Sequence, residues 1–363
     1  DRSPSAQSIA LISLAGFPTL SGQDGFDAAT KGTSLIKVTS GSTGGAKGIS
    51  LTAKQLLAEA RNIAVTLDLT PEDRIYAPVP IFHSYGFDLG VLAMLFSGAP
   101  LILEEIFVPR KILSRLTAPE ITVFLGVPSM YRFLLEATPL NPPDLSRLRY
   151  ALSCTAPLYP DLITAFHDTF NVPICQHYGS SETGAATTHI PQAVLDRPAS
   201  VGVAMKNVTV LIVDEQGREL PAGQKGEVVV RSEAVAGGYA MGPVAESSPF
   251  TDGAFRMGDI GHLDADGFLY LHGRKDALIN VGGLKVSPDE VTMVLESCPA
   301  VREAAVIGVR DAMGEEIVYA AVALRSALSE KELLAFCSSR LANYKVPRRL
   351  DIFEKLPRGP SGK

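Results

Sequence analysis

Short apolar runs alternate with helix-like stretches between residues 34 and 180, and this alternation constrains the fold more than any other feature. The runs RIYAPVP, ITVFLGVP and RYALSCTAP are each followed by a segment whose apolar residues recur at helical spacing. A strand that is followed by a helix and then by another strand favours parallel pairing, because the helix covers one face of the sheet. We therefore expect an α/β fold whose large N-terminal domain holds α/β sheet layers.

The pattern changes after about residue 200, where short strands are separated by Gly and Asp turns. Runs such as VTVLIVDEQG and FLYLHGR predict a small antiparallel β unit. From Ala277 onward, two helical patterns and two longer strands predict a small α+β domain, and SPDEVTMVLESCP opens its first helix with a Ser/Asp cap signal. We expect an N-terminal domain over residues 1–276 and a mobile C-terminal domain over residues 277–363.

Composition excludes several classes of protein. The formal net charge is −6 and the pI is about 5.6, which argues against nonspecific nucleic-acid binding, since that depends on a basic surface. The longest apolar stretch, Val91 to Leu103, is interrupted by Ser97, Gly98 and Pro100 and is too short to cross a bilayer. The first residues lack a basic segment followed by an apolar one, so no signal peptide and no integral membrane segment are expected.

The four cysteines are widely separated in the sequence and form no CxxC or Cys/His cluster. Neither a structural zinc site nor a disulfide framework is therefore indicated. Reduced thiols suit a cytoplasmic location, which we expect for this chain. These residues are Cys154, Cys175, Cys298 and Cys337.

The segment TSGSTGGAKG, residues 39–48, is the strongest local signal for chemistry. Its glycines leave backbone N–H groups free to face an anion, its hydroxyl groups add hydrogen-bond donors, and Lys47 adds a positive charge. A helix predicted over residues 51–67 should direct its positive end toward this loop. Ala46 and Gly48 flank the lysine, so the segment is not a P-loop. The alternative is a flexible Gly/Ser turn.

Five further segments follow the loop in a definite order. They are IFHSYGF at residues 81–87, QHYGSSETG at 176–184, FRMGDIGHLDADGFLYLHGRKD at 255–276, LINVGGLKVSPDEVTMVL, and the final LPRGPSGK. Together with the loop, they resemble the motifs of the acyl- and aryl-adenylate-forming superfamily, which includes acyl-CoA synthetases, luciferases and the adenylation domains of peptide synthetases. The chain departs from the family pattern at Ala46, where proline is usual, and at Ser181, where threonine is usual.

The resemblance implies an ATP site. Tyr178 would stack on adenine beside Gly179, Asp259 would accept the ribose hydroxyls, and Arg274 would donate to the ribose or phosphate. Glu182 would hold Mg²⁺, a cation that prefers a carboxylate together with phosphate oxygens. Taken singly, Tyr178 could be a packed aromatic, Glu182 a solvated charge and Asp259 a turn residue. The other nucleotide contacts implied are Thr39, Ser40, Gly41, Ser42, Thr43, Gly44, Lys47, Thr155, Ala156, Pro157, Gln176, His177, Ser180 and Ser181.

The resemblance also implies a pocket for a carboxylic acid. His83 would gate this pocket or, alternatively, be a packed or surface histidine. Ser84 stands where amino-acid-activating relatives carry an aspartate that holds the α-ammonium, and a buried ammonium without a partner is costly. An aryl or aliphatic acid is therefore favoured over an α-amino acid, although Asp88, one helical turn on, keeps that question open. The implied pocket residues are His83, Ser84, Asp88, Val127, Ser153 and Gly179.

The C-terminal domain is implied to serve two half-reactions. Lys363 matches the family lysine that bridges the attacking carboxylate and the α-phosphate, where a cation stabilises developing charge. Asp276 falls at the family's hinge, and Gly282, Gly283 and Lys285 would face the incoming thiol. The alternatives are a frayed terminal lysine at Lys363 and a plain surface acid at Asp276.

The implied reaction consumes ATP with Mg²⁺ and converts a carboxylic acid to its acyl-AMP, releasing pyrophosphate. The acyl group then passes to coenzyme A or, alternatively, to the phosphopantetheine of a carrier protein. Far fewer residues precede the loop than in family members, so we also expect a domain truncated at its start. A noncatalytic nucleotide-binding relative remains an alternative for that reason, whereas kinase and P-loop ATPase motifs are lacking.

Overall fold

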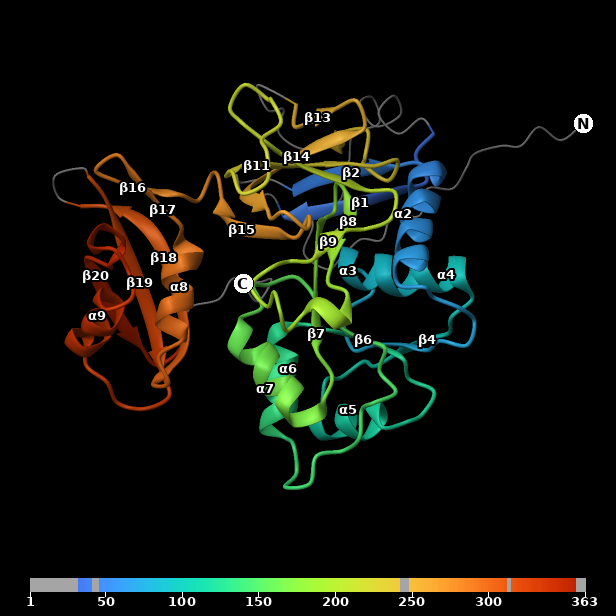
Figure 1. Ribbon diagram of the computed structural model, residues 1–363, viewed down its shortest axis with the longest axis horizontal. Coiled ribbons are helices and arrows are strands. Elements are labelled where there is room, and N and C mark those ends of the chain that lie inside the picture. The colour runs from blue at the N-terminus through green and yellow to red at the C-terminus, as the bar shows by residue number, and fades with distance from the viewer. Residues whose placement is uncertain (1–31, 41–45, 242–247, 312–314, 357–363) are drawn as a thin grey trace, which may run out of the picture.

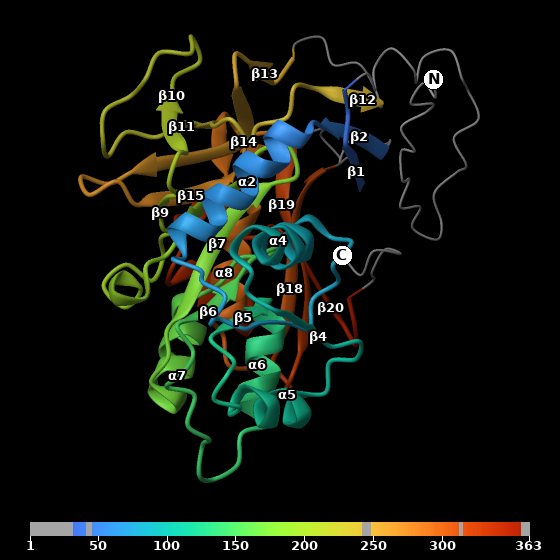
Figure 2. The ribbon, with the colours of Figure 1, turned by 90° about the vertical axis from the view of Figure 1, so that its right-hand side faces the viewer.

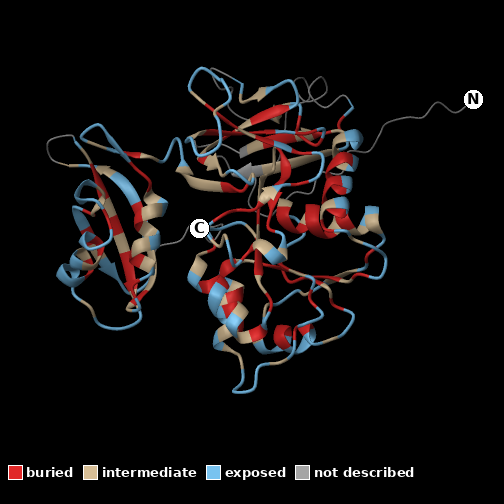
Figure 3. Ribbon diagram, viewed as in Figure 1, coloured by how far each residue is buried: buried red, intermediate tan, exposed pale blue. Residues whose placement is uncertain are grey.

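A computed structural model describes residues 32–40, 46–241, 248–311 and 315–356 of the chain. The larger part of the molecule contains three sheets, and a smaller unit drawn in orange and red lies beside it (Figure 1). Buried residues concentrate in the sheets and on the helix faces that cover them (Figure 3). The fold is thus α/β with a small antiparallel unit and a small α+β unit, as the sequence predicts.

A seven-stranded sheet forms the middle of the larger part. Its first five strands are parallel, which confirms the prediction made from the strand–helix alternation, and its last two are antiparallel. In spatial order the strands are β4 (Leu101–Leu103), β3 (Ile75–Ala77), β5 (Val123–Gly126), β6 (Tyr150–Ser153), β7 (Ile174–Ser180), β8 (Gly184–Thr188) and β9 (Val203–Ala204).

Helices connect and cover these strands. The segment after the predicted gate is helical, as expected, but its middle is a π-helix. The helices are α2 (Ala53–Thr66), α3 (Ser84–Gly86), the π-helix η1 (Phe87–Leu92), α4 (Ala93–Ser97), α5 (Pro109–Leu116), α6 (Pro128–Glu136), α7 (Pro160–Phe170) and the 3₁₀ turn η2 (Pro191–Ala193). None of the helices within the described parts of the chain has the length and apolar character that crossing a bilayer requires.

Two antiparallel sheets complete the larger part, and the second of them, which lies wholly after residue 200, confirms the predicted change of pattern. The first has the order β1 (Leu35–Ser40), β2 (Ala46–Leu51) and β12 (Tyr239–Met241). The second consists of β10 (Thr209–Val213), β11 (Gly226–Arg231), β14 (Ala254–Leu263) and β13 (Phe250–Thr251), with β15 (Leu269–Arg274) also paired to β14.

The prediction that a helix directly follows the Gly/Ser loop is wrong. The strand β2 comes first, because Ile49 and Leu51 alternate with polar residues and are buried on one face. Helix α2 begins only at Ala53, after Thr52 and Gln55 form a capping box. Since Leu51 pairs with Leu35 at the opposite end of the hairpin from the loop, the positive end of α2 does not face the loop.

The C-terminal unit has an apolar core of its own, built from residues such as Ile279, Val291, Val318 and Leu333. Its predicted helices and strands are all present, but the Ser287 hydroxyl makes no capping hydrogen bond with any described residue. The elements are β16 (Ile279–Val281), β17 (Leu284–Val286), α8 (Pro288–Glu296), β18 (Val301–Arg310), β19 (Glu316–Leu324), α9 (Glu330–Ser338), the 3₁₀ turn η3 (Asn343–Lys345) and β20 (Arg349–Phe353).

The two parts touch through a few polar contacts. Helix α8 lies near β15, and two long ion pairs cross between the parts, Arg132 to Glu296 at 3.7 Å and Arg325 to Glu136 at 3.9 Å. A view turned by 90° places the C-terminal unit behind the parallel sheet (Figure 2). The boundary expected between residues 276 and 277 stays a prediction.

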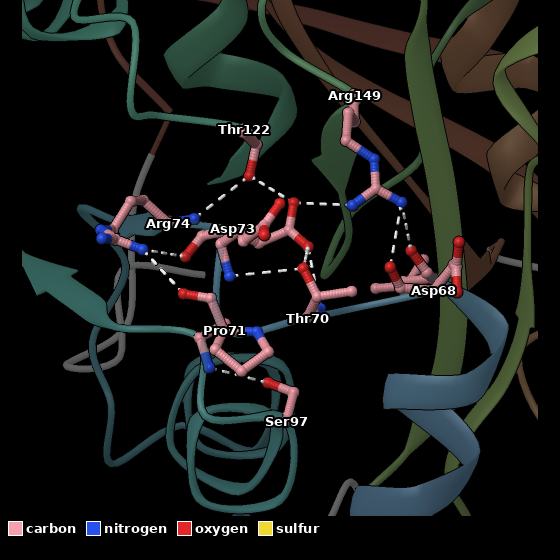
Figure 4. Close-up of polar contacts among 11 residues, drawn as sticks. Asp68, Thr70, Pro71, Asp73, Arg74, Ser97, Thr122 and Arg149 are labelled. Atoms are coloured by element: carbon pink, nitrogen blue, oxygen red, sulfur yellow. Dashed lines mark hydrogen bonds and ion pairs between the residues drawn. The ribbon is translucent and has the colours of Figure 1, made fainter.

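The amino ends of three parallel strands converge on one carboxylate, that of Asp73 (Figure 4). Asp73 precedes β3 and accepts hydrogen bonds from Thr122, before β5, at 2.7 Å and from Arg149, before β6, at 2.6 Å. Burial alone would raise the pKa of Asp73, but the hydrogen bonds from Arg149 and Thr122 hold it below its ordinary value. These contacts therefore stabilise the amino ends of the parallel strands.

Candidate active site

Three strands from two sheets bring together the aromatic, acidic and basic residues that the sequence predicts for a nucleotide. Tyr178 on β7 donates its hydroxyl hydrogen to Asp259 on β14, with an O–O distance of 2.5 Å. Arg274 stands directly across from Asp259 in the β14–β15 pairing, and its guanidinium lies 3.6 Å from the carboxylate. Residues separated by about a hundred positions thus form one polar group.

Burial shapes the ionisation of this group. Desolvation raises the pKa of Asp259, although the hydrogen bond from Tyr178 and the charge of Arg274 oppose the rise. Burial and the neighbouring Asp259 carboxylate also raise the pKa of Tyr178 well above its usual value. Tyr178 therefore remains a neutral hydrogen-bond donor, and Asp259 keeps one oxygen that Tyr178 does not occupy.

Arg274 is also paired with Asp276, the predicted hinge residue. Its Nε lies 3.0 Å from one Asp276 oxygen, and a second nitrogen donates to the Met257 carbonyl at 2.8 Å. The hydrogen bond from Arg274 lowers the pKa of Asp276. The residue predicted to contact ATP and the residue predicted to act as a hinge therefore hold each other in this structure.

Tyr239 on β12 is a site residue that the sequence reasoning missed. Its hydroxyl donates to Glu182 at 3.0 Å, and the ammonium of Lys47 lies 5.0 Å from the centre of its ring. Tyr239 thus connects the loop lysine to the predicted magnesium ligand. The only sequence signal was the preceding pair of glycines, Gly237 and Gly238, which lacks a specific meaning by itself.

Glu182 is suited to Mg²⁺ as a single protein carboxylate. It is half-buried, and Tyr239 occupies only one of its oxygens. Within the described ranges no group of three or more His, Cys, Asp or Glu residues could hold a metal. A single carboxylate fits an ion that takes its remaining ligands from phosphate oxygens and water.

The predicted acid-pocket segment touches the predicted nucleotide motif directly. The hydroxyl oxygens of Ser84, the first residue of α3, and Ser181, just after β7, are 2.6 Å apart. His83 is the exposed N-cap residue of α3, and Val127 is half-buried before α6. Ser153, at the carboxyl end of β6, is buried, and its hydroxyl has no partner among the described residues.

Asp88 lies beneath this segment and is occupied within the protein. Both of its oxygens accept hydrogen bonds from the Lys37 ammonium at 2.7 Å. A substrate ammonium would have to compete with Lys37 for this carboxylate. The geometry therefore supports the preference for acids without an α-amino group.

The first part of the QHYGSSETG motif is strand, because β7 continues through Tyr178 to Ser180. A Cβ atom on Gly179 would lie 2.2 Å from the Gly184 carbonyl oxygen, so the β7–β8 hairpin itself requires a glycine there. Burial lowers the pKa of His177 to about 4, which keeps its ring neutral. Gln176 is half-buried, and the Ser180 hydroxyl accepts from the backbone N–H of Glu182 at 3.2 Å.

Thr155 follows β6 with a φ of 75°, a left-handed conformation that is uncommon for a β-branched residue. Thr155, Ala156 and Pro157 are all exposed at the carboxyl end of the sheet, next to the predicted acid-pocket residue Ser153. Strained backbone of this kind is often found at functional sites. The placement agrees with a ligand-facing turn, and the role of these residues stays a prediction.

Several predicted residues lie outside the described part of the chain, including Gly41, Ser42, Thr43, Gly44 and Lys363. Thr39 and Ser40 form the end of β1, and Ser40 pairs with Ala46, so the hairpin leads into the loop from both sides. The predicted thiol-side residues Gly282, Gly283 and Lys285 are exposed at the turn of the β16–β17 hairpin. Their roles stay predictions.

Two family models match the chain. The model described as AMP-binding enzyme matches residues 26–240, and the model described as AMP-binding enzyme C-terminal domain matches residues 290–363. The chain belongs to the AMP-binding enzyme family. This membership confirms the resemblance found in the order of the sequence motifs.

Curated relatives of this AMP-binding family member are ligases of coenzyme A. It is 33% identical to the oxalate–CoA ligase of Arabidopsis thaliana, covering 91% of this chain and 65% of that protein. It is 34% identical to the feruloyl-CoA synthase of an Amycolatopsis species, covering 91% of this chain and 67% of that protein. The chain thus spans roughly two thirds of the length of these relatives.

Solved structures of the same family superpose closely. The o-succinylbenzoate coenzyme A synthetase of Bacillus subtilis with its acyl-adenylate intermediate matches with a TM-score of 0.83 and 31% identity, covering 91% of this chain and 67% of that one. The same enzyme with ATP and magnesium ion matches with a TM-score of 0.82 and 31% identity, covering 91% and 68%.

Proposed function

We propose that this family member activates a carboxylic acid with ATP, forming an acyl-AMP and pyrophosphate, and then transfers the acyl group to coenzyme A. The observation that carries the proposal is the convergence of Tyr178, Asp259 and Arg274 beside Glu182 and the loop lysine. This arrangement brings together an aromatic ring for adenine, a carboxylate for the ribose hydroxyls, cations for the phosphates and a second carboxylate for Mg²⁺. The named relatives, which are CoA ligases, support the same reaction.

The nucleotide would bind at the carboxyl ends of β6 and β7. Asp259 would accept the ribose hydroxyls with the oxygen that Tyr178 does not occupy, while Tyr178 presents its ring to adenine. The loop at residues 39–48 and Lys47 would hold the phosphates, and Glu182 would hold Mg²⁺, which neutralises phosphate charge when bound. No protein nucleophile is needed, because positioning and charge neutralisation drive attack on the α-phosphate.

The acid would enter beside Ser84 and Ser153 and meet the α-phosphate near Ser181. Its carboxylate attacks phosphorus, the bond to the pyrophosphate breaks, and a thiol later displaces AMP. We propose that residues 277–363 form the domain that turns about Asp276 between these steps. In one orientation Lys363 would approach the acid, and in the other the Gly282–Gly283 turn and Lys285 would approach the thiol.

Exchange of labelled pyrophosphate into ATP tests the first step. A panel of oxalate, ferulate, sulfoacetate, o-succinylbenzoate and a long-chain fatty acid samples the chemistry in the names of the relatives and neighbours. We expect exchange that depends on one of these acids and falls about 10²-fold or more in Lys363→Ala. A folded protein that binds ATP but shows no exchange with any of them would refute the proposal.

The acceptor of the second step is tested separately. Coenzyme A and a holo carrier protein are compared as thiols after acyl-AMP has formed, and thioester formation is measured. We expect coenzyme A to be the better acceptor. Preferential transfer to the carrier protein would instead assign the chain as a loading domain.

We also propose a reducing, cytoplasmic setting for this protein. The free state of its four cysteines supports this location.

A further inference from the structure

Three ionisable side chains that the proposed reaction does not use are buried together behind the acid pocket. Lys37 lies on β1, Glu59 on α2 and Asp88 on η1. The side chains of Lys37 and Asp88 are only 10% and 5% exposed, and Glu59 is 3% exposed. Burying ionisable groups costs free energy, and only part of that cost is offset by pairing them, so we ask what this cluster does for the site.

The Lys37–Asp88 ion pair connects two segments of the candidate site, the strand β1 and the π-helix η1. Lys37 is two residues before Thr39, where β1 leads into the phosphate loop, and Asp88 is four residues after Ser84 in the acid-pocket segment. The ammonium is 2.7 Å from both carboxylate oxygens, a bidentate contact that fixes direction as well as distance. The pair therefore ties the strand that feeds the nucleotide loop to the helix that forms the acid pocket.

Glu59 joins the same cluster to the third part of the site. One of its oxygens accepts the backbone N–H of Ala185 at 2.7 Å, where β8 leaves the QHYGSSETG motif. Gly184 has a φ of 67°, and a Cβ atom there would lie 2.2 Å from the other Glu59 oxygen. The carboxyl group is thus packed directly against the end of the motif that carries Tyr178 and Glu182.

The segment proposed to form the acid pocket contains a π-helix. Residues Phe87–Leu92 adopt the π form, which is rare and is often associated with functional sites. Asp88, which contacts Lys37, lies within this π-helix, and the Lys37 ammonium also lies 5.9 Å from the Phe87 ring centre. The charge pair and the unusual turn occur at the same residues.

We propose that Lys37, Asp88 and Glu59 are positioning residues that hold the acid pocket, the phosphate-loop strand and the Tyr178 motif in one fixed arrangement. The proposal rests on the proposed function, because the two substrates held by these segments must meet in line. A misplacement of about 1 Å at such a site can lower the rate about 100-fold. The cluster thus acts on the rate of acyl-AMP formation more than on the affinity for ATP.

The test compares Lys37→Met, the double variant Lys37→Met/Asp88→Leu and the control Lys111→Met. Lys111 forms an exposed ion pair with Glu104, also at 2.7 Å, so the control breaks a contact of equal length outside the cluster. The kcat of acid-dependent pyrophosphate exchange, the Kd for ATP and Tm are measured for each. The rates are compared at a temperature well below the Tm of every variant.

We expect Lys37→Met to lower kcat about 10-fold or more, with the Kd for ATP changing less than about threefold. In the double variant neither partner of the Lys37–Asp88 ion pair is left without the other, so Tm should recover while kcat stays low. The control should match the wild type in kcat. Recovery of kcat together with Tm in the double variant would overturn the proposal, because the pair would then serve stability alone.

Hydrogen exchange gives a readout that does not depend on activity. We expect Lys37→Met to increase exchange at the amides of residues 84–92, a segment distant from Lys37 in sequence, and not in β18 or β19 of the C-terminal unit. If the wild type activates no acid, the proposed function is refuted. Hydrogen exchange still shows whether Lys37 fixes the position of residues 84–92. Unchanged exchange at residues 84–92 would overturn the inference on its own.

Discussion

Tyr178 engages Asp259 through its hydroxyl group, whereas stacking on adenine would use only its ring. Tyr178→Phe keeps the ring and removes a bond of about 1–2 kcal/mol, so kcat/KM for ATP should fall roughly 5- to 30-fold. Pyrophosphate exchange at varied ATP concentration measures the change. Tyr319→Phe is the matched control, because its hydroxyl binds Asp351 within the C-terminal unit. Equal losses in both variants would contradict a specific role for the Tyr178 hydroxyl.

Glu59 makes the stability of the protein depend on pH. Burial, together with the nearby Asp88 charge, raises the pKa of Glu59 from 4.5 to about 8. The folded state therefore retains a proton that the unfolded chain releases above pH 4.5. This contribution to stability is complete below pH 4.5, falls as the pH rises toward 8, and is lost above it.

Glu59→Gln should flatten that dependence, since an amide does not ionise. Each pKa unit corresponds to about 1.4 kcal/mol, so the free energies of unfolding of the two proteins should diverge by a few kcal/mol between pH 5 and pH 8.5. Urea denaturation at four pH values across this range measures the difference. Parallel curves for the wild type and the variant would show that Glu59 is ionised in the folded protein throughout.

The parallel strands depend on one carboxylate at their amino ends. Asp73→Ala removes the acceptor shared by Thr122 and Arg149 and leaves the Arg149 guanidinium without its closest acidic partner. We expect a loss of about 2–4 kcal/mol of stability with kcat unchanged, because the candidate site lies at the other end of the strands. Urea unfolding and pyrophosphate exchange check the two parts of this expectation. A large loss of kcat at full folding would contradict it.

Local patterns predicted the elements well where one period dominated. The parallel strands and helices α6 and α7 follow from apolar runs and helical spacing. The prediction was wrong at residues 46–51, where a short alternating run is followed directly by helical spacing. These residues form a strand because β2 pairs with β1 and β12, which lie far from each other in the sequence. The π-helix at Phe87–Leu92 also has no sequence period that separates it from an ordinary helix.

The candidate site was predictable where a motif carries the chemistry, as with Tyr178, Asp259 and Arg274. It was not predictable where chemistry depends on contacts between distant segments. Lys37 and Asp88 are 51 positions apart, and Glu59 and Ala185 are 126 apart. Lys37, Asp88 and Glu59 each look like an ordinary charged residue in the sequence, and only the fold shows that they are buried together.

The Arg274–Asp276 contact lies next to the proposed boundary between the two units, so a rotation about residue 276 would have to accommodate it. Asp276→Pro fixes φ at this position and should therefore restrict the rotation. We expect overall thioester formation to fall about 10-fold or more while the Kd for ATP stays constant. Pyrophosphate exchange and thioester formation, measured separately, show which half-reaction is lost. If both half-reactions proceed at the wild-type rate, Asp276 is not the hinge.

The Lys37–Asp88 ion pair between β1 and η1 constrains any attempt to change the acid that the protein accepts. Grafting a relative's acid pocket would exchange residues around 75–188 but leave Lys37 on a strand of a different sheet. If the graft places an apolar side chain where Asp88 now stands, an ammonium remains buried without its counter-ion. A successful transplant must therefore carry position 37 together with position 88, although they lie in separate segments of the chain.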